Sequence, residues 1–422
     1  MRVCFYHQSF VKPFDFNSIK QYPVSGTVST LIYIAHRLQS FGIDVTICNK
    51  TETQVIDGVK YREIHSYSEF IDYENQSNFD VVVYVGPELE FASQFAPLLK
   101  AKKKVMWAHN GWQSNSCFNI FDAIVCVSNS MRLHYSYLPI FEKICFIHNG
   151  VKINYFPQTL LSLEKTQKAI FIGSITQSKG LHHVLRAWDQ IKSLSPGAEL
   201  LVAGSAKLYG IDQLGSLGIA TPDYEDNFLK QYLFTSEGGS NNKLRDDVHF
   251  LGAVPHSSLG ELIATCRVAL VNPSWESSET CCNSALEAQA SGTPVVGINI
   301  GSLPEVIRDR STGIIVYRPD DNLYAQSVAS VLNDPTLSKK LGNSAREFVL
   351  TNFNYENQAK KWITLFEFLL VNDSIPYELT HNWYKDSFHL SVIKWIARKT
   401  KLGLIAREVI DNYRSIKKRD AK

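Results

Sequence analysis

The segment 277–297, SSETCCNSALEAQASGTPVVG, holds the residues whose types and spacing could do chemistry. Two carboxylates, Glu279 and Glu287, lie eight positions apart, and the adjacent thiols of Cys281 and Cys282 lie between them. This set is compatible with a reactive thiol, with a metal centre, or with a ligand site whose carboxylates bind hydroxyl groups. The rest of the chain has to decide among these three kinds of site.

Cysteine usage argues against a thiol or disulfide function. No pair among the eight cysteines has C-x-x-C spacing, and four of them lie in apolar runs such as AIVCVS. Buried free thiols in a reducing compartment are the usual meaning of this pattern. No cluster of Asp, His or Cys has metal-ligand spacing. We therefore expect a ligand site without a metal and without a cofactor.

Length and composition limit the class of protein. A chain of 422 residues is too long for one ordinary core, so two domains are expected. Its formal charge of +2 is too small to indicate a basic surface that binds nucleic acid. No apolar run reaches the roughly 18 residues that span a bilayer. The N-terminus, MRVCFYHQSF, enters a strand directly and has no signal-peptide core, so we expect a cytoplasmic protein.

Short β-branched runs alternate with amphipathic helical stretches, a pattern that predicts parallel sheets covered by helices. Helices are expected at 27–42 and 181–194, the first ending at Gly42. Strands are expected at 2–7, 44–48, 80–86, 103–109, 123–128 and 144–150 in the first half, and at 169–174, 199–205, 248–252, 268–274, 293–298 and 313–317 in the second.

The predicted fold class is therefore α/β, with two doubly wound Rossmann-like domains at 1–158 and 159–355. The segment 208–245 interrupts the second domain and is predicted to be a surface insertion. Ligands of such sheets bind at the carboxyl ends of the strands, and here we expect a site in a cleft between the two sheets. Neither half carries G-x-G-x-x-G, which argues against a nicotinamide oxidoreductase.

The stretch PSWESSETCCNSALEAQASGTPVVG resembles the E-x7-E signature of the retaining glycosyltransferases of family 4, which have the GT-B fold. Four further stretches resemble the same family in the same order along the chain. These are FIHNGVKINYF, IGSITQSKGLHHVLRAW, HFLGAVPHSSLGELIATCRVALVNPS and NIGSLPEVIRDRSTGIIVYRPDD. The resemblance covers about residues 1 to 370. It implies that residues 356–372 form a helix that crosses back onto the first domain.

The resemblance implies transfer of a sugar from a nucleotide diphosphate sugar to an acceptor hydroxyl, with retention at the anomeric carbon. The acceptor would be a glycan or a lipid-linked sugar, in polysaccharide or glycolipid biosynthesis. By the same resemblance, Glu279 contacts the donor sugar, Glu287 binds the ribose hydroxyls and His109 lines the active centre. Two alternatives remain open: a GT-B nucleotide-sugar epimerase, and a non-catalytic protein that binds nucleotide sugars.

The diphosphate of such a donor needs positive charge and free amides. A helix beginning near Cys281 and ending before Gly292 would offer the first N–H groups to an anion. These would be the amides of Thr280, Cys281, Cys282 and Asn283. Lys179 would add a point charge, and the backbone at Gly26 would approach a phosphate. The resemblance places the nucleobase against the backbone of Gly252 to Val254.

Two positions depart from the family pattern. Ser174 lies where an arginine often follows the strand glycine, and Asn110 lies where many relatives carry an aspartate. One expected positive charge and one expected negative charge are therefore missing. These departures favour the non-catalytic alternative.

The C-terminal tail, residues 373–422, has a composition of its own. Between 384 and 422 it carries eleven Lys or Arg against four acidic residues, a difference of +7. Phe388, Val392, Trp395, Ile396 and Lys399 fall at helical spacing. Such a basic amphipathic segment can lie in an anionic membrane interface. It can equally dock on the protein body with a solvated basic face.

Overall fold

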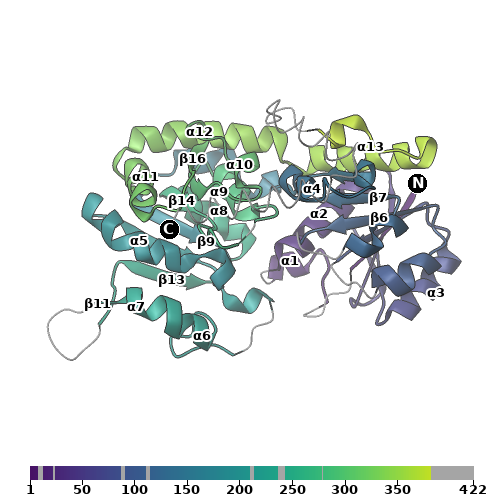
Figure 1. Ribbon diagram of the computed structural model, residues 1–422, viewed down its shortest axis with the longest axis horizontal. Helices are drawn as coiled ribbons and strands as arrows, with labels where there is room; N and C mark the ends of the chain where they lie inside the picture. The colour runs from purple at the N-terminus through teal and green to yellow at the C-terminus, as the bar shows by residue number, and fades with distance from the viewer. Residues whose placement is uncertain are drawn as a thin grey trace. The chain divides into compact units, whose positions relative to one another are not determined.

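The computed structural model describes residues 1–7, 13–21, 24–86, 91–110, 115–209, 213–235, 243–277 and 279–381. The chain forms two compact units (Figure 1). Among the described residues, unit 1 contains those within Met1–Phe16, within Thr30–Asn149 and from Tyr355 to His381, and unit 2 contains those within Asn17–Ser29 and Gly150–Asn354. The C-terminal tail beyond residue 381 lies outside the described residues.

Unit 1 is built on an eight-stranded sheet in the order β3-β4-β2-β1-β5-β6-β7-β8. Its strands pair in parallel, except that β3 is antiparallel to β4. The apolar run that forms β5 is buried along its whole length, as expected for a strand covered on both faces. The strands are β1 (Arg2–Tyr6), β2 (Asp44–Asn49), β3 (Gln54–Ile56), β4 (Val59–Glu63), β5 (Val81–Val85), β6 (Lys103–Ala108), β7 (Ala123–Cys126) and β8 (Ile144–Phe146).

The helices of unit 1 come from both ends of the chain. α13 packs its fully buried Trp362 against Trp107, with ring centroids 4.8 Å apart, and against Phe5 at 6.3 Å. The α-helices are α2 (Gly26–Ser40, which belongs to unit 1 from Thr30 onwards), α3 (Tyr67–Ser77), α4 (Asn129–His134) and α13 (Tyr355–Asn372). Short turns are η1 (Phe91–Phe95), η2 (Ala96–Leu98), η3 (Asn115–Ile120), η4 (Phe141–Lys143) and η10 (Tyr377–Leu379).

Unit 2 is built on a six-stranded sheet in the order β13-β10-β9-β14-β15-β16, and its strand pairs are parallel. From β9 the chain first extends the sheet through β10 to β13, and then returns to the other side of β9 with β14. The gap between β9 and β14 is therefore the point where the strand order reverses, which is where ligands of doubly wound sheets bind. The strands are β9 (Thr166–Ile172), β10 (Glu199–Ala203), β13 (Val248–Gly252), β14 (Cys266–Leu270), β15 (Val295–Ile298) and β16 (Gly313–Val316).

The helices of unit 2 pack on this sheet and on each other. α5 packs against α11, and α9 packs against α8 and α12 (Figure 1). The helices are α1 (Ser18–Gln21), α5 (Leu181–Leu194), α6 (Pro222–Tyr224), α7 (Lys230–Leu233), α8 (His256–Ala264), α9 (Asn283–Ala290), α10 (Leu303–Val306), α11 (Asp321–Asn333) and α12 (Pro335–Asn352). Short turns are η5 (Ile153–Tyr155), η6 (Gln158–Ser162), η7 (Gln177–Lys179), η8 (Ala206–Tyr209) and η9 (Glu225–Leu229), and β11 (Phe234–Thr235) pairs with β12 (Lys243–Leu244).

The predicted α/β class with two doubly wound sheets is confirmed. Each predicted strand is present, and the predicted helix at 181–194 is α5. Gly42, predicted to end α2, has a φ of 86°. The eight cysteines are free and buried, as expected. The predicted domain boundary after residue 158, and the donor and acceptor roles of the two halves, stay predictions.

The prediction that 208–245 is only a surface insertion is wrong. Ala220, Leu229 and Leu233 from this segment are fully buried in the core of unit 2. The hydroxyl of Tyr224 lies 2.9 Å from Nδ1 of His182 on α5. The segment folds onto α5 because its apolar side chains bury surface that the helix would otherwise expose.

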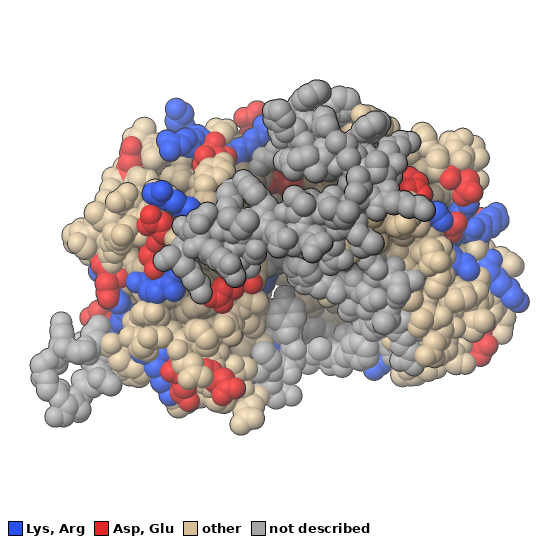
Figure 2. Space-filling view, in the orientation of Figure 1, with Lys and Arg blue, Asp and Glu red and all other residues tan. Residues whose placement is uncertain are grey.

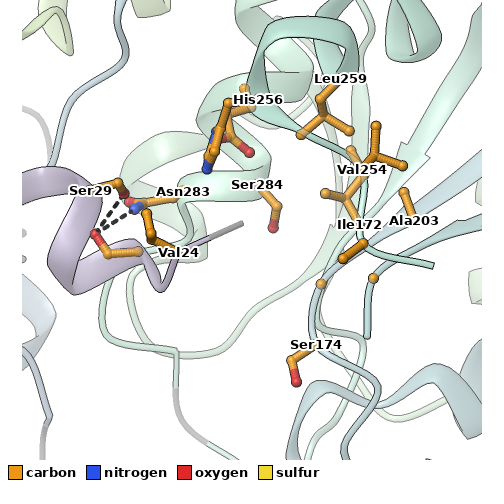
Figure 3. A pocket seen from close by; sticks show the side chains of 15 residues that line it. Val24, Ser29, Ile172, Ser174, Ala203, Val254, His256, Leu259, Asn283 and Ser284 are labelled. Atoms are coloured by element: carbon orange, nitrogen blue, oxygen red, sulfur yellow. Dashed lines mark hydrogen bonds and ion pairs between the residues drawn. The ribbon is translucent and has the colours of Figure 1, made fainter. Parts of the chain in front are cut away.

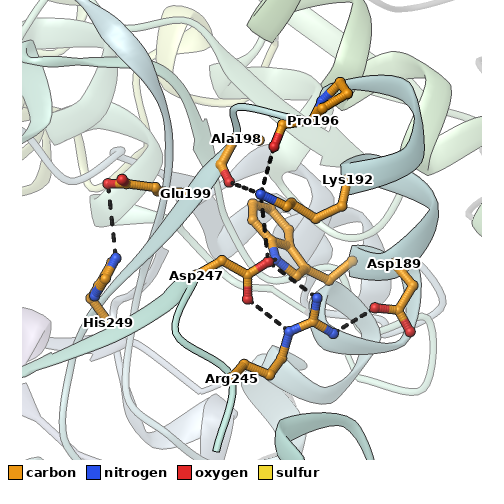
Figure 4. Close-up of polar contacts among 9 residues, drawn as sticks. Asp189, Lys192, Pro196, Ala198, Glu199, Arg245, Asp247 and His249 are labelled. Carbon is orange, nitrogen blue, oxygen red and sulfur yellow. Dashed lines mark hydrogen bonds and ion pairs between the residues drawn. The ribbon is translucent and has the colours of Figure 1, made fainter. Parts of the chain in front are cut away.

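A polar network fastens the end of this segment to α5 (Figure 4). Arg245 Nη1 donates to Asp189 Oδ1 at 2.6 Å, and Arg245 Nε donates to Asp247 Oδ1 at 2.8 Å. The indole Nε1 of Trp188 donates to Asp247 Oδ2 at 3.0 Å. Burial alone would raise the pKa of Asp247, but Arg245, Trp188 and Lys192 together lower it. The network therefore holds a carboxylate in its charged form beside β13.

Among the residues that the structure describes, no helix combines the length and apolar character needed to cross a bilayer. On the face that Figure 2 shows, described Lys and Arg side chains are interspersed with Asp and Glu side chains.

Candidate active site

Lys179 and Glu279, one hundred positions apart in the sequence, form an ion pair in unit 2. Lys179 ends the turn η7 after β9, and Glu279 lies in the loop between β14 and α9. Lys179 Nζ lies 2.7 Å from Glu279 Oε2, and the side chains are 29% and 5% exposed. Both residues therefore follow the strands that flank the reversal point of the sheet.

Gly180 lets the loop carrying Lys179 approach the loop after β14. Its φ is 75°, and a Cβ there would lie 2.8 Å from the backbone nitrogen of Ser274. Any larger residue would meet both strain and a clash at this place. Ser277 Oγ adds a hydrogen bond of 2.6 Å to the carbonyl of Ser178. The two loops are thus fixed against each other.

The Glu279 carboxylate is buried, yet it stays charged. Burial would raise the pKa of Glu279, but Lys179, Asn272 and the backbone N–H of Cys281 outweigh it, so the pKa is lowered. Asn272 Nδ2 donates to Oε2 at 2.6 Å. Asn272 is itself buried and has a φ of 35°, an unusual conformation for a residue other than glycine. The surrounding structure holds Asn272 in that conformation, aimed at the carboxylate.

The backbone of Glu279 is held as tightly as its side chain. The N–H of Ser302 donates to the Glu279 carbonyl at 2.8 Å. Gly301 has a φ of 48°, and a Cβ there would lie 2.1 Å from the same carbonyl oxygen. The contribution of Ser302 here is therefore its backbone amide.

A cavity of about 150 Å³ opens at the carboxyl ends of β9 and β10 in unit 2 (Figure 3). Four predicted donor-binding residues line it: Gly26, Val254, Asn283 and Glu287. Asn283 Nδ2 lies 3.4 Å from the Gly26 carbonyl, so the start of α9 meets the start of α2. Among the described residues of unit 2, six other predicted positions do not line this cavity: Lys179, Gly252, Glu279, Thr280, Cys281 and Cys282.

Glu287 lies at the cavity and has a partner that the sequence did not suggest. Its Oε1 lies 3.1 Å from Nδ1 of His256, and the two side chains are 14% and 22% exposed. Burial would lower the pKa of His256, but Glu287 raises it further than burial lowers it. His256 follows Pro255 and begins α8. The only sequence signal for it was its place just after the predicted nucleobase loop.

The predicted start of the helix at Cys281 is two residues too early, because α9 begins at Asn283. The N–H of Cys281 is bonded to the Glu279 carboxylate, and the N–H of Asn283 donates to the Cys281 carbonyl at 3.1 Å. The prediction that these two amides are free for an anion is therefore wrong in this structure. Burial raises the pKa of Cys282 to about 12, so its thiol stays protonated and unreactive.

Two further predicted positions have local roles. Ser174, the departure from the family arginine, is buried at the cavity and donates a long hydrogen bond of 3.3 Å to the Ser205 carbonyl. Gly252 has a φ of 69°, and its carbonyl accepts the N–H of Gly204 at 2.8 Å. It therefore ties the loop before Val254 to the end of β10.

His109, the predicted catalytic histidine, belongs to unit 1 and directly follows β6. Burial, helped by the nearby His7, lowers the pKa of His109 to about 3. Its Nε2 has no hydrogen-bond partner among the described residues. His7 follows β1, and its Nδ1 lies 2.6 Å from the carbonyl of Val85 at the end of β5. A neutral imidazole with one uncommitted nitrogen thus lies at a strand end in the doubly wound sheet.

No group of three or more His, Cys, Asp or Glu side chains among the described residues is placed to hold a metal ion. The residues that sequence analysis missed are Asn272 and His256. Asn272 lies two residues after the end of β14, at the reversal point of the sheet, and that position was its only signal.

The family model described as glycosyl transferases group 1 matches residues 154–348, a segment that includes Lys179, Glu279, Glu287 and the cavity-lining residues from Ile172 onwards. This segment of the chain is similar to the glycosyl transferases group 1 family. An uncharacterized glycosyltransferase of Methanocaldococcus jannaschii is 27% identical over 240 residues, which are 54% of each chain.

Solved structures of similar shape show that the fold of the chain is GT-B. A sucrose-phosphate synthase from Thermosynechococcus elongatus matches with a TM-score of 0.68 and 17% identity, covering 88% of this chain and 99% of that one. HepE from Anabaena, solved in complex with UDP-glucose, matches with a TM-score of 0.64 and 15% identity, covering 86% and 99%. The chain spans about half the length of the first curated relatives that it matches.

Proposed function

We propose that this protein is a retaining glycosyltransferase that moves a sugar from a nucleotide diphosphate sugar to an acceptor hydroxyl. The observation that carries the proposal is the placement of the two glutamates of the family signature. Glu279 is buried and ion-paired to Lys179 at the reversal point of the unit 2 sheet, and Glu287 lies at the cavity. The matched family segment contains both.

In the proposed reaction, unit 2 binds the donor and unit 1 contributes to the acceptor side. Glu287 accepts hydrogen bonds from the ribose hydroxyls, and Glu279 contacts the donor sugar. Lys179 stabilises the negative charge that develops on the leaving diphosphate. The leaving phosphate oxygen accepts the proton of the acceptor hydroxyl, so the new bond forms on the face that the diphosphate leaves. His109, neutral because of its low pKa, contributes a hydrogen bond but no charge.

The proposal is tested by hydrolysis of nucleotide sugars in the absence of acceptor. UDP-glucose is the first substrate to try, because HepE was solved with it, followed by GDP-mannose and ADP-glucose. We expect slow release of the nucleoside diphosphate from one of them, with the sugar released in the α or β form that it had in the donor. Binding of a nucleotide sugar without any turnover, with or without candidate acceptors, would instead indicate the non-catalytic alternative, which Ser174 and Asn110 favour.

The same assay gives a prediction about metals. Activity should persist in excess EDTA, because Lys179 and backbone amides are proposed to meet the diphosphate charge. A matched reaction with EDTA followed by excess Mg²⁺ or Mn²⁺ is the control. Loss of activity that either ion restores would contradict the metal-free donor site.

The acceptor is proposed to be a glycan or a lipid-linked sugar in polysaccharide or glycolipid biosynthesis. A lipid-linked acceptor would require the enzyme to work on the cytoplasmic face of a membrane. The tail between 384 and 422, with its excess of seven basic residues, is proposed to contact anionic lipid, each basic residue adding about 1 kcal/mol near the surface.

Deletion of residues 387–422 should abolish salt-sensitive sedimentation with anionic liposomes and leave nucleotide-sugar hydrolysis unchanged. Zwitterionic liposomes are the control for apolar attachment alone. If the full-length protein does not sediment with anionic liposomes at low salt, the membrane proposal is wrong. The alternative, that the tail docks on the protein body, then holds.

A further inference from the structure

The cavity of unit 2 contains a charge pair whose two members come from different helices. His256 is the first residue of α8, and Glu287 lies in the second turn of α9. His256 Nδ1 and Glu287 Oε1 are 3.1 Å apart, and both residues line the cavity. The imidazole therefore fixes one oxygen of the carboxylate and leaves the other available to a ligand.

The net charge of this pair affects how tightly the cavity binds an anionic ligand. A carboxylate that is only 14% exposed would repel a bound diphosphate if its charge stood alone. A protonated His256 cancels that charge at hydrogen-bond distance. The ring then also donates from Nδ1, so the carboxylate is both oriented and neutralised.

Other ionisable groups on the elements that pack against α8 are few. Those elements are α1, η5, η6, β14 and α9. Apart from Glu287, they carry Lys20, Tyr155, Cys266 and Arg267, and α8 itself carries Glu261. Of these, Arg267 donates to the carbonyl of Leu332. The charge that acts on the pKa of His256 is that of Glu287, which raises the pKa against the effect of burial.

We infer that His256 is a positioning residue of the donor site, which holds Glu287 for the ribose and makes nucleotide-sugar affinity depend on pH. This inference rests on the proposed function. His256 is protonated below its pKa, so the pair is neutral there. As the pH rises through that pKa the positive charge is lost, the charge of Glu287 is left unbalanced, and affinity for the anionic donor falls.

The test is the dissociation constant of a nucleotide sugar, measured by titration calorimetry between about pH 6 and pH 8.5. The ligand is whichever of UDP-glucose, GDP-mannose and ADP-glucose binds the wild type best. Their diphosphates are esterified at both ends, so their charge stays constant in this range. We expect the wild-type constant to rise on the order of fivefold with pH.

His256→Gln should bind weakly at every pH, with a flat profile, because glutamine can donate a hydrogen bond but carries no charge. His256→Asn serves as a second variant if the first does not fold. His249→Gln is the matched control, because His249 faces Glu199 at 3.8 Å and neither of these two residues lines the cavity. This control should keep the wild-type pH profile.

A wild-type affinity that does not change with pH, or a wild-type profile in His256→Gln, would overturn the inference. A second measurement tests the pair directly: the pKa of His256, followed by NMR, should fall in Glu287→Gln, and an unchanged pKa would overturn the inference as well. If the folded wild type binds none of the three nucleotide sugars, the proposed function is overturned, and the inference falls with it.

Discussion

Replacement of Glu279 by glutamine is expected to lower turnover by about a hundredfold or more and to leave the fold intact. Glutamine has nearly the shape of the glutamate but no charge. It cannot balance Lys179 or make a charge-assisted hydrogen bond to the sugar as the transition state develops. Turnover is measured as nucleoside diphosphate release, and folding is checked by thermal denaturation of the same preparation.

Glu276→Gln is the matched control for this prediction. Glu276 lies in the same loop but is exposed, so its replacement should leave turnover within about a factor of two of the wild type. A folded Glu279→Gln variant with wild-type turnover would show that Glu279 does not contact the donor in the transition state. The loss should appear in kcat, because a contact made mainly in the transition state affects kcat more than KM.

Replacement of Lys179 by methionine is expected to destabilise the protein on the order of 3 kcal/mol at neutral pH, because it leaves the buried Glu279 carboxylate without its ion pair. Burial is the largest influence on the Glu279 pKa, and without Lys179 it should raise that pKa. The measurement is the free energy of unfolding from urea denaturation at several pH values.

The pH dependence of that variant has a definite sign. In the wild type the pKa of Glu279 is lowered, so its contribution to stability is present above the pKa of the unfolded chain and is lost as the pH falls through the folded pKa. In Lys179→Met the folded pKa is raised, so the variant should gain stability relative to the wild type as the pH falls from about 7 to about 5.

Two comparisons make the Lys179 prediction specific. Lys179→Met/Glu279→Gln should recover part of the lost stability, because the uncompensated charge is removed. Lys168→Met removes a lysine whose pair with Glu199 is more exposed, at 35% and 44%, and should cost less than about 1 kcal/mol. Equal losses in Lys168→Met and Lys179→Met would contradict the account of Glu279 as a buried, paired carboxylate.

Much of the fold could be predicted from local sequence. The buried strands of parallel sheets are continuous β-branched runs, and those of β5 and β9 were found for that reason. α5 was predicted with its observed bounds because its apolar spacing begins just after Gly180, whose left-handed conformation ends the preceding turn. Glu279 and Glu287 were identified by their spacing.

The remaining features depend on contacts between distant segments. α9 begins later than predicted because the amide of Cys281 is bonded to the Glu279 carboxylate, which no helix propensity reveals. The strained backbone of Asn272 exists because the loop around it aims its side chain at Glu279. The burial of Leu229 and Leu233 depends on the neighbouring surface of α5, and their Gly- and Ser-rich surroundings indicated an exposed segment instead.

The division of the chain into units has a consequence for chimaeric enzymes. Residues 17–29 belong to unit 2 although they precede most of unit 1 in the sequence, and Val24, Gly26 and Ser29 among them line the cavity. A hybrid joined at Gly150 would transplant the family-matched segment but keep these three residues from the recipient protein. The cavity of such a hybrid would be lined by residues from both parent proteins. An exchange intended to transfer donor preference should therefore include residues 17–29 together with 150–354.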